Sequence, residues 1–221
     1  MIRLNVLVEG QTELNFVKEI LAEHLTGFGV VVLPRMVETS RTKRKTYRGG
    51  LSNFDKAFRD LARWIQEDKK ASWFTTMFDL YALPNSFPDY AIASKQADPL
   101  KRVTTLEAAF GKKVNSHKFV PYIQLYEFET LIFADPQALS LEYLDRKNEI
   151  GQLAELAKRM EPETINNNRD TSPSHRITKL IGEYDKATSG VSVVKQIGIP
   201  KIREKCPHFN EWLKRLESLK P

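Results

Sequence analysis

Acidic residues recur where the sequence is expected to leave a β-strand. Five carboxylates share this position: Glu9, Glu13, Asp79, Glu127 and Glu129. If parallel strands bring them to one edge of a sheet, their charges repel unless they take up protons or share a divalent cation. An all-oxygen set suits Mg²⁺ or Mn²⁺ better than zinc. One or two such ions support in-line attack on a phosphodiester. The pattern therefore predicts that these five residues are metal ligands and catalytic residues of a phosphodiester-cleaving site.

Each of these acids also has an ordinary structural explanation. A carboxylate at Glu13, in the first turn of a helix, complements the helix dipole. Asp79 can cap or turn a loop. Glu127 and Glu129 point the same way only if their segment stays extended, because in a helix they lie about 200° apart. The joint occurrence at three strand ends favours a common site. Within it, Glu9 is our choice of general base, because it stands at the strand tip nearest a glycine turn.

Basic residues form a second pattern that suits a polyanionic partner. The chain has 34 Lys and Arg against 28 Asp and Glu, and residues 35–48 hold a cationic run with one acid, Glu38. Such a run can neutralise several phosphates of a nucleic acid; the alternative is a solvated loop. Arg176 could hold a phosphate oxygen bidentately, and Lys186 could stabilise charge on a leaving group. The predicted nucleic-acid contacts are Arg41, Lys43, Arg44, Lys45, Arg48, Arg176 and Lys186.

Alternating strands and helices must position these residues. Hydrophobic periodicity predicts strands at residues 2–8, 30–33, 73–78 and 119–125, and helices at residues 12–25, 52–67 and 99–110. Beyond residue 128 the pattern is helical, around residues 139–144, 150–160, 176–184 and 209–219. The predicted fold class is α/β: a parallel sheet core flanked by helices in residues 1–135, with a mainly helical C-terminal region in residues 136–221 packed on that core.

Composition excludes several classes of protein. The 221 residues are 41% hydrophobic and 28% charged, which is typical of a globular chain. A single cysteine, Cys206, rules out an internal disulfide framework. No apolar run reaches the ~20 residues of a membrane span, and the N-terminal segment lacks the pattern of a signal peptide. We therefore expect a cytoplasmic protein without a membrane partner. No Walker-type phosphate loop is present, so the chain is not itself expected to be a P-loop ATPase.

Several motifs together resemble a known family. The hexapeptide VEGQTE at residues 8–13, placed after an alternating strand, resembles the opening motif of the Toprim fold in the E-G-x-x-E form of the OLD-family nucleases. Four later segments resemble a bacterial Toprim-like family of unknown function: TMFDLY at 76–81, QLYEFE at 124–129, PSHR at 173–176 and CPHFNEW at 206–212. The ordered set of segments is more specific than the hexapeptide alone.

The resemblance implies a small Toprim core that binds Mg²⁺ or Mn²⁺ and cuts or handles nucleic acid. It also implies the nuclease half of a two-gene system with an ABC- or AAA-type ATPase partner, often in phage defence. Glu9 and Glu13 match the first acidic motif, and Asp79 matches the first carboxylate of the second. Where topoisomerases and primases have Asp-x-Asp, this chain has Tyr81 at the second position, and a tyrosine is not anionic near neutral pH. Either the later glutamates complete the metal set, or only one ion binds well.

Three functions remain open on this basis. The leading hypothesis is a metal-dependent nuclease or phosphodiesterase that acts as the effector of an ATPase-coupled anti-phage system. The alternative is a Toprim-shaped adaptor that binds an ATPase partner and has a weak or silent metal site. A third is a toxin-like ribonuclease that uses the same site. Metal-assisted phosphoryl chemistry does not depend on the 2′-hydroxyl, so the residues do not separate DNA from RNA.

Overall fold

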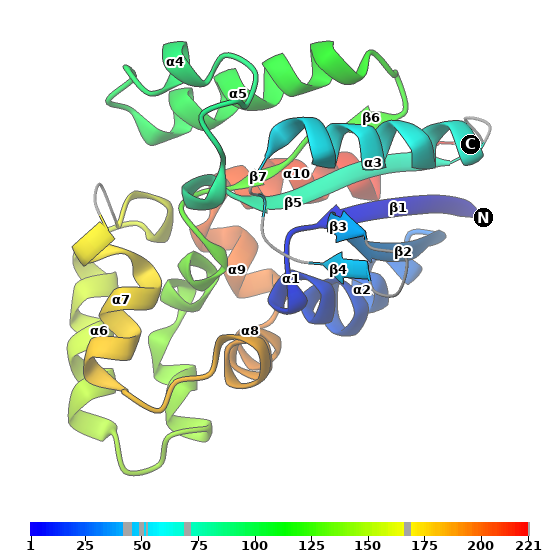
Figure 1. The fold of residues 1–221 in the computed structure, drawn as a ribbon. Coiled ribbons are helices and arrows are strands. Elements are labelled where there is room, and N and C mark those ends of the chain that lie inside the picture. Colours follow the sequence, from blue (N-terminus) through cyan, green and yellow to red (C-terminus); the bar gives the residue numbers. More distant parts are fainter. Residues whose placement is uncertain (42–45, 49–50, 52, 69–71, 166–168, 221) are drawn as a thin grey trace.

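The computed structural model describes residues 1–41, 46–48, 51, 53–68, 72–165 and 169–220. Its centre is a five-stranded parallel sheet, ordered β2-β1-β5-β6 with β7 also paired to β5 (Figure 1). The strands are β1 (Ile2–Val8), β2 (Val30–Met36), β5 (Trp73–Asp79), β6 (Phe119–Val120) and β7 (Ile123–Gln124). Two short antiparallel strands, β3 (Glu38–Arg41) and β4 (Thr46–Arg48), follow β2. The predicted basic loop therefore contains strand structure in its described part.

Helices cover both faces of the sheet, as expected for parallel strands. Alternate residues of β1 divide between two hydrophobic clusters: Val6 packs on one face and Leu7 on the other. On the Leu7 face lie α3 (Phe54–Glu67) and α5 (Pro99–Val114). The opposite face carries the first helical segment and the C-terminal helices. The predicted class, a parallel α/β sheet flanked by helices, is confirmed.

The helix predicted at residues 12–25 is present as one continuous helical run. It comprises α1 (Gln11–Phe16), a π-helical turn η1 (Val17–Leu21) and α2 (Ala22–Thr26). Gly10 is the N-cap residue of α1 and has no side chain with which to cap it. The chain thus passes from β1 into α1 through only two residues, which fixes the helix start at the carboxyl end of the sheet.

The strand predicted at residues 119–125 is interrupted. Its two parts, β6 and β7, pair with two separate stretches of β5, at Phe74–Thr75 and at Phe78–Asp79. Pro121 lacks an N–H and lies in the gap. The Thr76 hydroxyl replaces the missing ladder bonds, because it accepts from the Tyr122 N–H at 3.1 Å and donates to the Tyr122 carbonyl at 2.9 Å. The sheet edge is therefore completed by a side chain.

In the described part of the chain after residue 128, the regular elements are helical. The α-helices are α6 (Lys147–Arg159), α7 (Pro173–Leu180), α8 (Val191–Ile197), α9 (Ile199–Lys205) and α10 (Pro207–Glu217). The short helices are η3 (Phe128–Ala134), η4 (Pro136–Leu141), η5 (Pro162–Thr164), η6 (Arg169–Thr171) and η7 (Lys186–Gly190). Elsewhere lie η2 (Leu80–Ala82) and α4 (Tyr90–Ala93). The division at residue 135 stays a prediction.

The last helix is fastened to the sheet by aromatic packing and one hydrogen bond. The Trp212 indole N–H donates to the Thr75 hydroxyl at 2.9 Å. Its ring stacks on Tyr122, with centroids 4.1 Å apart and planes inclined by 10°. Both contacts fall beside the interrupted edge strand. The C-terminal helices and β1 consequently share one hydrophobic cluster.

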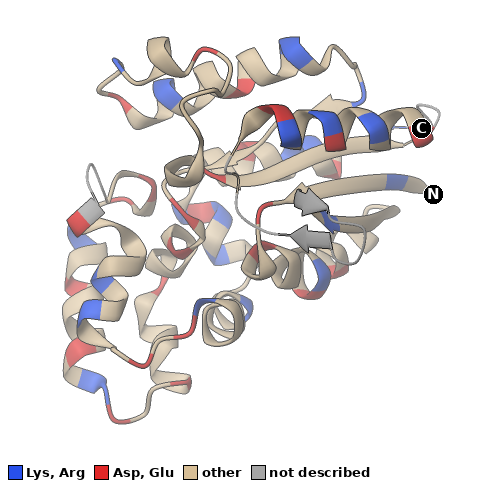
Figure 2. Ribbon diagram, viewed as in Figure 1, with Lys and Arg blue, Asp and Glu red and all other residues tan. Residues whose placement is uncertain are grey.

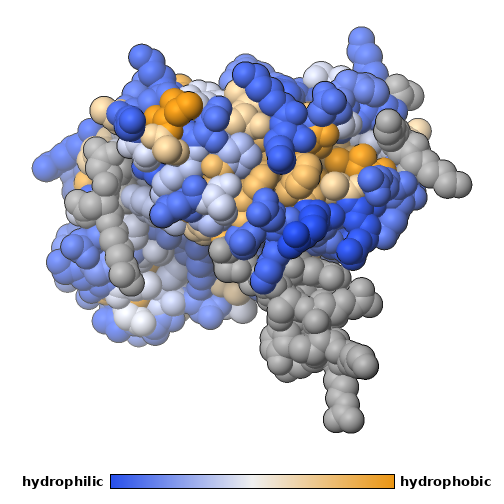
Figure 3. All heavy atoms as spheres, turned by 45° about the horizontal axis from the view of Figure 1, so that its top comes forward, coloured by the Kyte–Doolittle hydropathy of each residue, from blue (hydrophilic) through white to orange (hydrophobic). Residues whose placement is uncertain are grey.

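The outer surface mixes polar and apolar residues. Figure 3 shows hydrophobic areas between hydrophilic side chains on one face of the molecule. Ile92 and Leu144 are among the exposed large hydrophobic residues. None of the described helices combines the length and the apolar character that crossing a bilayer requires.

Candidate active site

The carboxyl ends of β1 and β5 bring Glu9 and Asp79 together. The two strands are adjacent and parallel, with Val8 opposite Met77, so both acids leave the sheet at the same edge. Figure 2 shows acidic positions, in red, where the ribbons of β1 and β5 end. One Glu9 oxygen, Oε2, lies 3.4 Å from the backbone nitrogen of Asp79, and Oε1 lies 3.4 Å from that of Leu51. This edge is where ligands bind in open parallel sheets.

Glu13 joins the pair from the first turn of α1. Its side chain is almost fully buried, and its Oε2 accepts the Gly10 N–H at 2.9 Å. A Cβ on Gly10 would approach this oxygen to 3.2 Å, so a side chain there would crowd the carboxylate. Burial, followed by the charge of Asp79, raises the pKa of Glu13 to about 8. The same two causes raise the pKa of Glu9 to about 7. The acids therefore form one electrostatic unit.

Asp79 has one oxygen paired and one without a regular partner. Oδ2 lies 3.3 Å from the Lys186 Nζ. Oδ1 is buried and forms no hydrogen bond of normal geometry within the described residues, although the Phe128 N–H is near enough to lower the pKa of Asp79. Burial is the largest effect on that pKa and raises it, while Lys186 acts in the opposite direction. An unsatisfied buried carboxylate oxygen is costly and requires an explanation.

Glu129 is the most deeply buried acid of the set. It is 0% exposed; its Oε2 lies 3.0 Å from the Lys186 Nζ, and its Oε1 accepts the Tyr184 hydroxyl at 3.4 Å. Burial raises the pKa of Glu129 to about 7, against the lowering effect of Lys186. Burial lowers the pKa of Lys186, but Asp79 and Glu129 raise it above its usual value. Lys186 therefore remains cationic and links the two acids.

Glu127 has a different role from Glu129. The chain is extended at Glu127 and turns into η3 at the next residue, so the two glutamates do not continue along one strand face. Oε1 of Glu127 accepts the Ser174 N–H at 2.7 Å, and Oε2 accepts the Ser174 hydroxyl at 2.8 Å. Glu127 thus anchors the start of α7. Its charge still raises the pKa of Asp79 and of Glu129.

The next feature is the residue at the second position of the Asp-x-Asp motif, which is Tyr81 in this chain. Tyr81 lies in η2, just after β5, and its ring is 5.7 Å from that of Tyr126. Burial, followed by the nearby Tyr126, raises the pKa of Tyr81 to about 12. The side chain is therefore neutral at physiological pH, as its residue type predicts.

The oxygen donors suit a hard divalent cation. Within the part of the chain that the structure describes, four carboxyls lie near one ammonium group, that of Lys186: Glu9, Glu13, Asp79 and Glu129. With all four ionised they would carry an excess of negative charge in a buried place, which a cation or bound protons must offset. The open Oδ1 of Asp79 is a ready ligand for Mg²⁺ or Mn²⁺. Among the described residues, however, no three acidic, histidine or cysteine side chains already surround one point. Lys186 instead bridges two of the acids, Asp79 and Glu129.

The predicted phosphate-binding residues fall into three groups. Lys186 points into the carboxylates, as described above. The Arg176 guanidinium donates from Nε to the Thr171 carbonyl at 2.7 Å and from Nη2 to the Ile165 carbonyl at 3.5 Å, so it already holds the adjoining loop. Lys43, Arg44 and Lys45, with the side chains of Arg41 and Arg48, lie outside the described residues.

Sequence reasoning missed two supporting residues. Tyr184 donates to Glu129, and a Cβ on Gly190 would clash with its hydroxyl, so Gly190 leaves room for the ring. Ser174, which sequence analysis did not propose as a site residue, fixes both oxygens of Glu127. No local sequence pattern identifies Tyr184 or Ser174 as a site residue, because each bonds to an acid about 50 residues away in the sequence. The one hint in the sequence is that Tyr184 lies close to Lys186.

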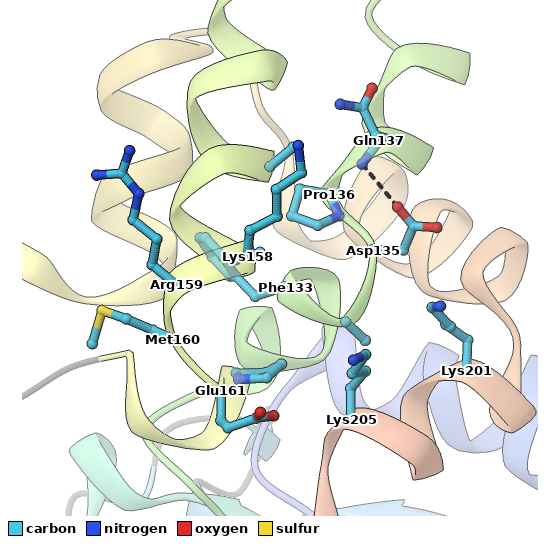
Figure 4. Close-up of a pocket in the computed structure, with 14 residues that line it drawn as sticks. Phe133, Asp135, Pro136, Gln137, Lys158, Arg159, Met160, Glu161, Lys201 and Lys205 are labelled. Atoms are coloured by element: carbon cyan, nitrogen blue, oxygen red, sulfur yellow. Dashed lines mark hydrogen bonds between the residues drawn. The ribbon is translucent and has the colours of Figure 1, made fainter.

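Two cavities open on the surface near these elements. One of about 490 Å³ borders the site and is lined by Tyr81, Glu127, Ser172, Ser174, His175 and Thr178. A second, of about 660 Å³, lies between η3, α6 and α9 (Figure 4). Lys158, Arg159, Lys201 and Lys205 are on its rim, with Glu161 and Asp135. The larger cavity includes none of the five predicted site acids.

Comparisons with known proteins place the chain in a family. No curated protein matches it. A solved structure, the C-terminal region of the Xanthomonas campestris pv. campestris OLD protein, is similar with a TM-score of 0.41 and 14% identity over 97% of each chain. A likeness at that level says nothing of activity. Residues 8–217 match the family described as a domain of unknown function, DUF4276. Since that match spans nearly the whole chain, the protein belongs to the DUF4276 family.

Proposed function

We propose that this protein is a Mg²⁺- or Mn²⁺-dependent nuclease. The observation that carries the proposal is the group of buried carboxyls at the carboxyl edge of the sheet, where burial and the charge of Asp79 raise the pKa values of Glu9 and Glu13. A purely structural site would pair such acids with as many cations. Among the residues that the structure describes, one lysine pairs with these acids, and Asp79 keeps an oxygen without a regular partner. Clusters of perturbed acids of this kind are typical of functional sites.

Each residue has a role that its geometry supports. Asp79 would hold the cation through its open oxygen, with Glu9 or Glu13 as a further ligand. When bound, the metal supplies Lewis acidity and makes water more acidic. Glu9, with a pKa of about 7, is suited to accept a proton from the attacking water near neutral pH. Lys186 pairs with Asp79 and Glu129, and its ammonium group would stabilise a leaving oxygen.

The finer parts of the proposal come from the sequence motifs. We propose a Toprim core, a cytoplasmic location, and an ABC- or AAA-type ATPase partner in a phage-defence system. The basic run at residues 41–48 would contact the phosphates of the nucleic acid. Co-purification of the protein with an ATPase encoded beside it tests the partner independently of the nuclease.

A cleavage assay tests the proposed activity. Labelled DNA and RNA, each single- and double-stranded, are incubated with Mn²⁺ and either the wild type, Glu13→Gln or Asp79→Asn. We expect each variant to lose more than about 100-fold in rate, beyond the 10–100-fold typical of outer-shell changes to a metal site. Glutamine resembles protonated Glu13, the main form of a group with a pKa of about 8 at pH 7, so Glu13→Gln should fold.

Glu67→Gln is the matched control for that assay. Glu67 is exposed at the end of α3, next to Asp68, which pairs with Arg3 at the opposite edge of the sheet. The control should keep wild-type activity and wild-type melting temperature. Full activity in both site variants would remove Glu13 and Asp79 from the mechanism.

One observation favours an adaptor as the second candidate. Lys186 already bridges Asp79 and Glu129, and the described residues show no ready three-ligand metal site. An adaptor would keep this ion pair permanently. Calorimetry with Mn²⁺ separates the two functions: binding that Glu13→Gln weakens supports the nuclease, and the absence of binding supports the adaptor.

A further inference from the structure

The cavity of about 490 Å³ adjoins the carboxylate cluster through Glu127. Glu127, whose charge acts on Asp79 and Glu129, is part of its lining, and Tyr81 follows Asp79 by two residues. The volume lies in the ~300–1,000 Å³ range of small-ligand sites. A group bound in this cavity would therefore lie close to the part of the substrate on which the carboxylates act.

The lining chemistry suits a neutral, planar group rather than a phosphate. Among the described lining residues, Glu127 is the one acidic residue, and none is a lysine or an arginine. A phosphate would be repelled there. Hydroxyls of Ser172, Ser174 and Thr178 supply hydrogen-bonding groups, as the edge of a nucleobase requires.

Tyr81 supplies an aromatic surface. Its backbone N–H donates to the Tyr126 carbonyl at 3.0 Å, its ring packs at 5.7 Å from the Tyr126 ring, and the residue is 41% exposed. The ring is thus held by a neighbour and still open to the cavity. A second aromatic ring, that of the exposed His175, is also in the lining. Aromatic side chains placed in this way are typical stacking platforms for unpaired bases.

The polar part of the lining is held in place. Ser174 is tied to Glu127 through both its N–H and its hydroxyl, and the Ser172 and Ser174 hydroxyl oxygens are 3.3 Å apart. The Ser172 hydroxyl also caps α7 by accepting the His175 N–H at 3.2 Å. These bonds fix the wall of the cavity before any ligand arrives, which lowers the entropic cost of binding.

We propose that this cavity binds one unstacked nucleobase of the substrate, with the base stacked on Tyr81. The substrate class is then single-stranded or locally unpaired nucleic acid, because a base inside a duplex must leave its stack to enter. The inference rests on the proposed function and adds strand selectivity to it. It also assigns a role in substrate binding to Tyr81. This residue occupies the position of the second carboxylate in the Asp-x-Asp motif.

Binding measurements without cleavage test the proposal. Fluorescence anisotropy in EDTA uses a labelled 20-nucleotide single strand of mixed sequence, as DNA and as RNA, and the corresponding duplexes. We expect the better-bound single strand to exceed its duplex in affinity. Tyr81→Ala should weaken single-strand binding about 5- to 100-fold, the effect of losing one aromatic–base stack. Tyr81→Phe should retain wild-type affinity, because the ring is kept.

Phe28→Ala is the control for nonspecific binding of nucleic acid by an exposed aromatic ring. Phe28 is 47% exposed and lies beside Gly29, whose carbonyl accepts the Ile2 N–H at the opposite edge of the sheet. This variant should bind like the wild type. A scan that replaces one nucleotide at a time by an abasic unit should find a position that weakens wild-type binding but has no further effect on Tyr81→Ala.

Three results would overturn the proposal: unchanged affinity in Tyr81→Ala, equal losses in Tyr81→Ala and Phe28→Ala, or no abasic position coupled to Tyr81. Bis(p-nitrophenyl) phosphate carries no nucleobase, so its hydrolysis with Mn²⁺ reports the carboxylates, and the control Phe28→Ala should leave it unchanged. Absence of any Mn²⁺-dependent hydrolysis, combined with base binding that depends on Tyr81, would refute the nuclease and keep the base site.

Discussion

Binding of Mn²⁺ should depend steeply on pH, because the ligands must lose protons first. Glu9 and Glu13 have pKa values of about 7 and about 8, raised from 4.5 mainly by burial. At pH 6 both are mostly protonated, and by pH 8.5 both are mostly ionised. A divalent cation competes with those protons, so its apparent affinity should rise across this interval.

The expected size follows from the two pKa values. Between pH 6 and pH 8.5 the ionised fraction of Glu9 rises about tenfold and that of Glu13 about 80-fold. If both must be ionised, the affinity for Mn²⁺ should rise about 800-fold. Replacing Glu13 by Gln removes the larger factor and should leave a rise of about tenfold. The slope, rather than the affinity itself, is therefore the informative quantity.

Calorimetry at several pH values measures both the affinity and the protons released. In two buffers of different ionisation enthalpy, the wild type should release between one and two protons per ion near pH 7, and Glu13→Gln should release fewer. An affinity that is flat from pH 6 to pH 8.5, or an identical slope in the wild type and Glu13→Gln, would refute the assignment of these carboxyls as ligands.

The protons bound by Glu9 and Glu13 also make folding stability depend on pH. Stability should fall as the pH rises, whereas the affinity for Mn²⁺ should rise. In EDTA the folded protein holds protons on Glu9 and Glu13 that the unfolded chain releases above a pKa of 4.5. This contribution is complete below about pH 4.5 and is lost as pH rises through about 7 to 8. The melting temperature in EDTA should thus fall over that range relative to Glu13→Gln, and saturating Mn²⁺ should offset the fall.

Further expected outcomes concern the residues that support the site. Lys186→Met should lower the free energy of unfolding by about 1–3 kcal/mol in urea titrations. This is less than the ~3–5 kcal/mol expected for a fully buried ion pair, because 37% of the lysine side chain is exposed. An unchanged stability would mean that the ion pair is unimportant. Trp212→Phe should cost about 1–2 kcal/mol through the lost bond to Thr75, and a neutral result would contradict that anchoring role. Gly190→Ala should lower the melting temperature by crowding the Tyr184 hydroxyl; Tyr184→Phe in the same chain should recover part of the loss, and strict additivity would argue against the contact.

The sheet and its acidic edge follow from short-range patterns. Alternation at residues 2–8 predicts β1, and the glycine after Glu9 predicts the turn into α1, which the structure bears out. Parallel strands of an α/β fold must end at one edge, so the meeting of Glu9 with Asp79 follows from strand order alone. The alternation did not reveal that β1 is buried on both faces, because a second layer of helices comes from distant parts of the chain.

The hydrogen bonds and ion pairs within the site join segments that are far apart in the sequence. Glu127 is drawn away from Glu129 because α7 docks with Ser174 beside it. Lys186 reaches Asp79 across 107 residues of sequence. Neither contact leaves a periodic or local signal. The break at Pro121 was visible as a residue type, but the Thr76 hydroxyl that repairs the sheet edge is specified only by the folded geometry.

The most direct test of the metal site is anomalous diffraction from crystals grown with Mn²⁺ at pH 8. The account predicts a manganese peak ligated by Asp79 together with Glu9 or Glu13, and a Lys186 ammonium group no longer bound to Asp79. Crystals with no manganese at this edge of the sheet, and with Lys186 still joining Asp79 to Glu129, would contradict it.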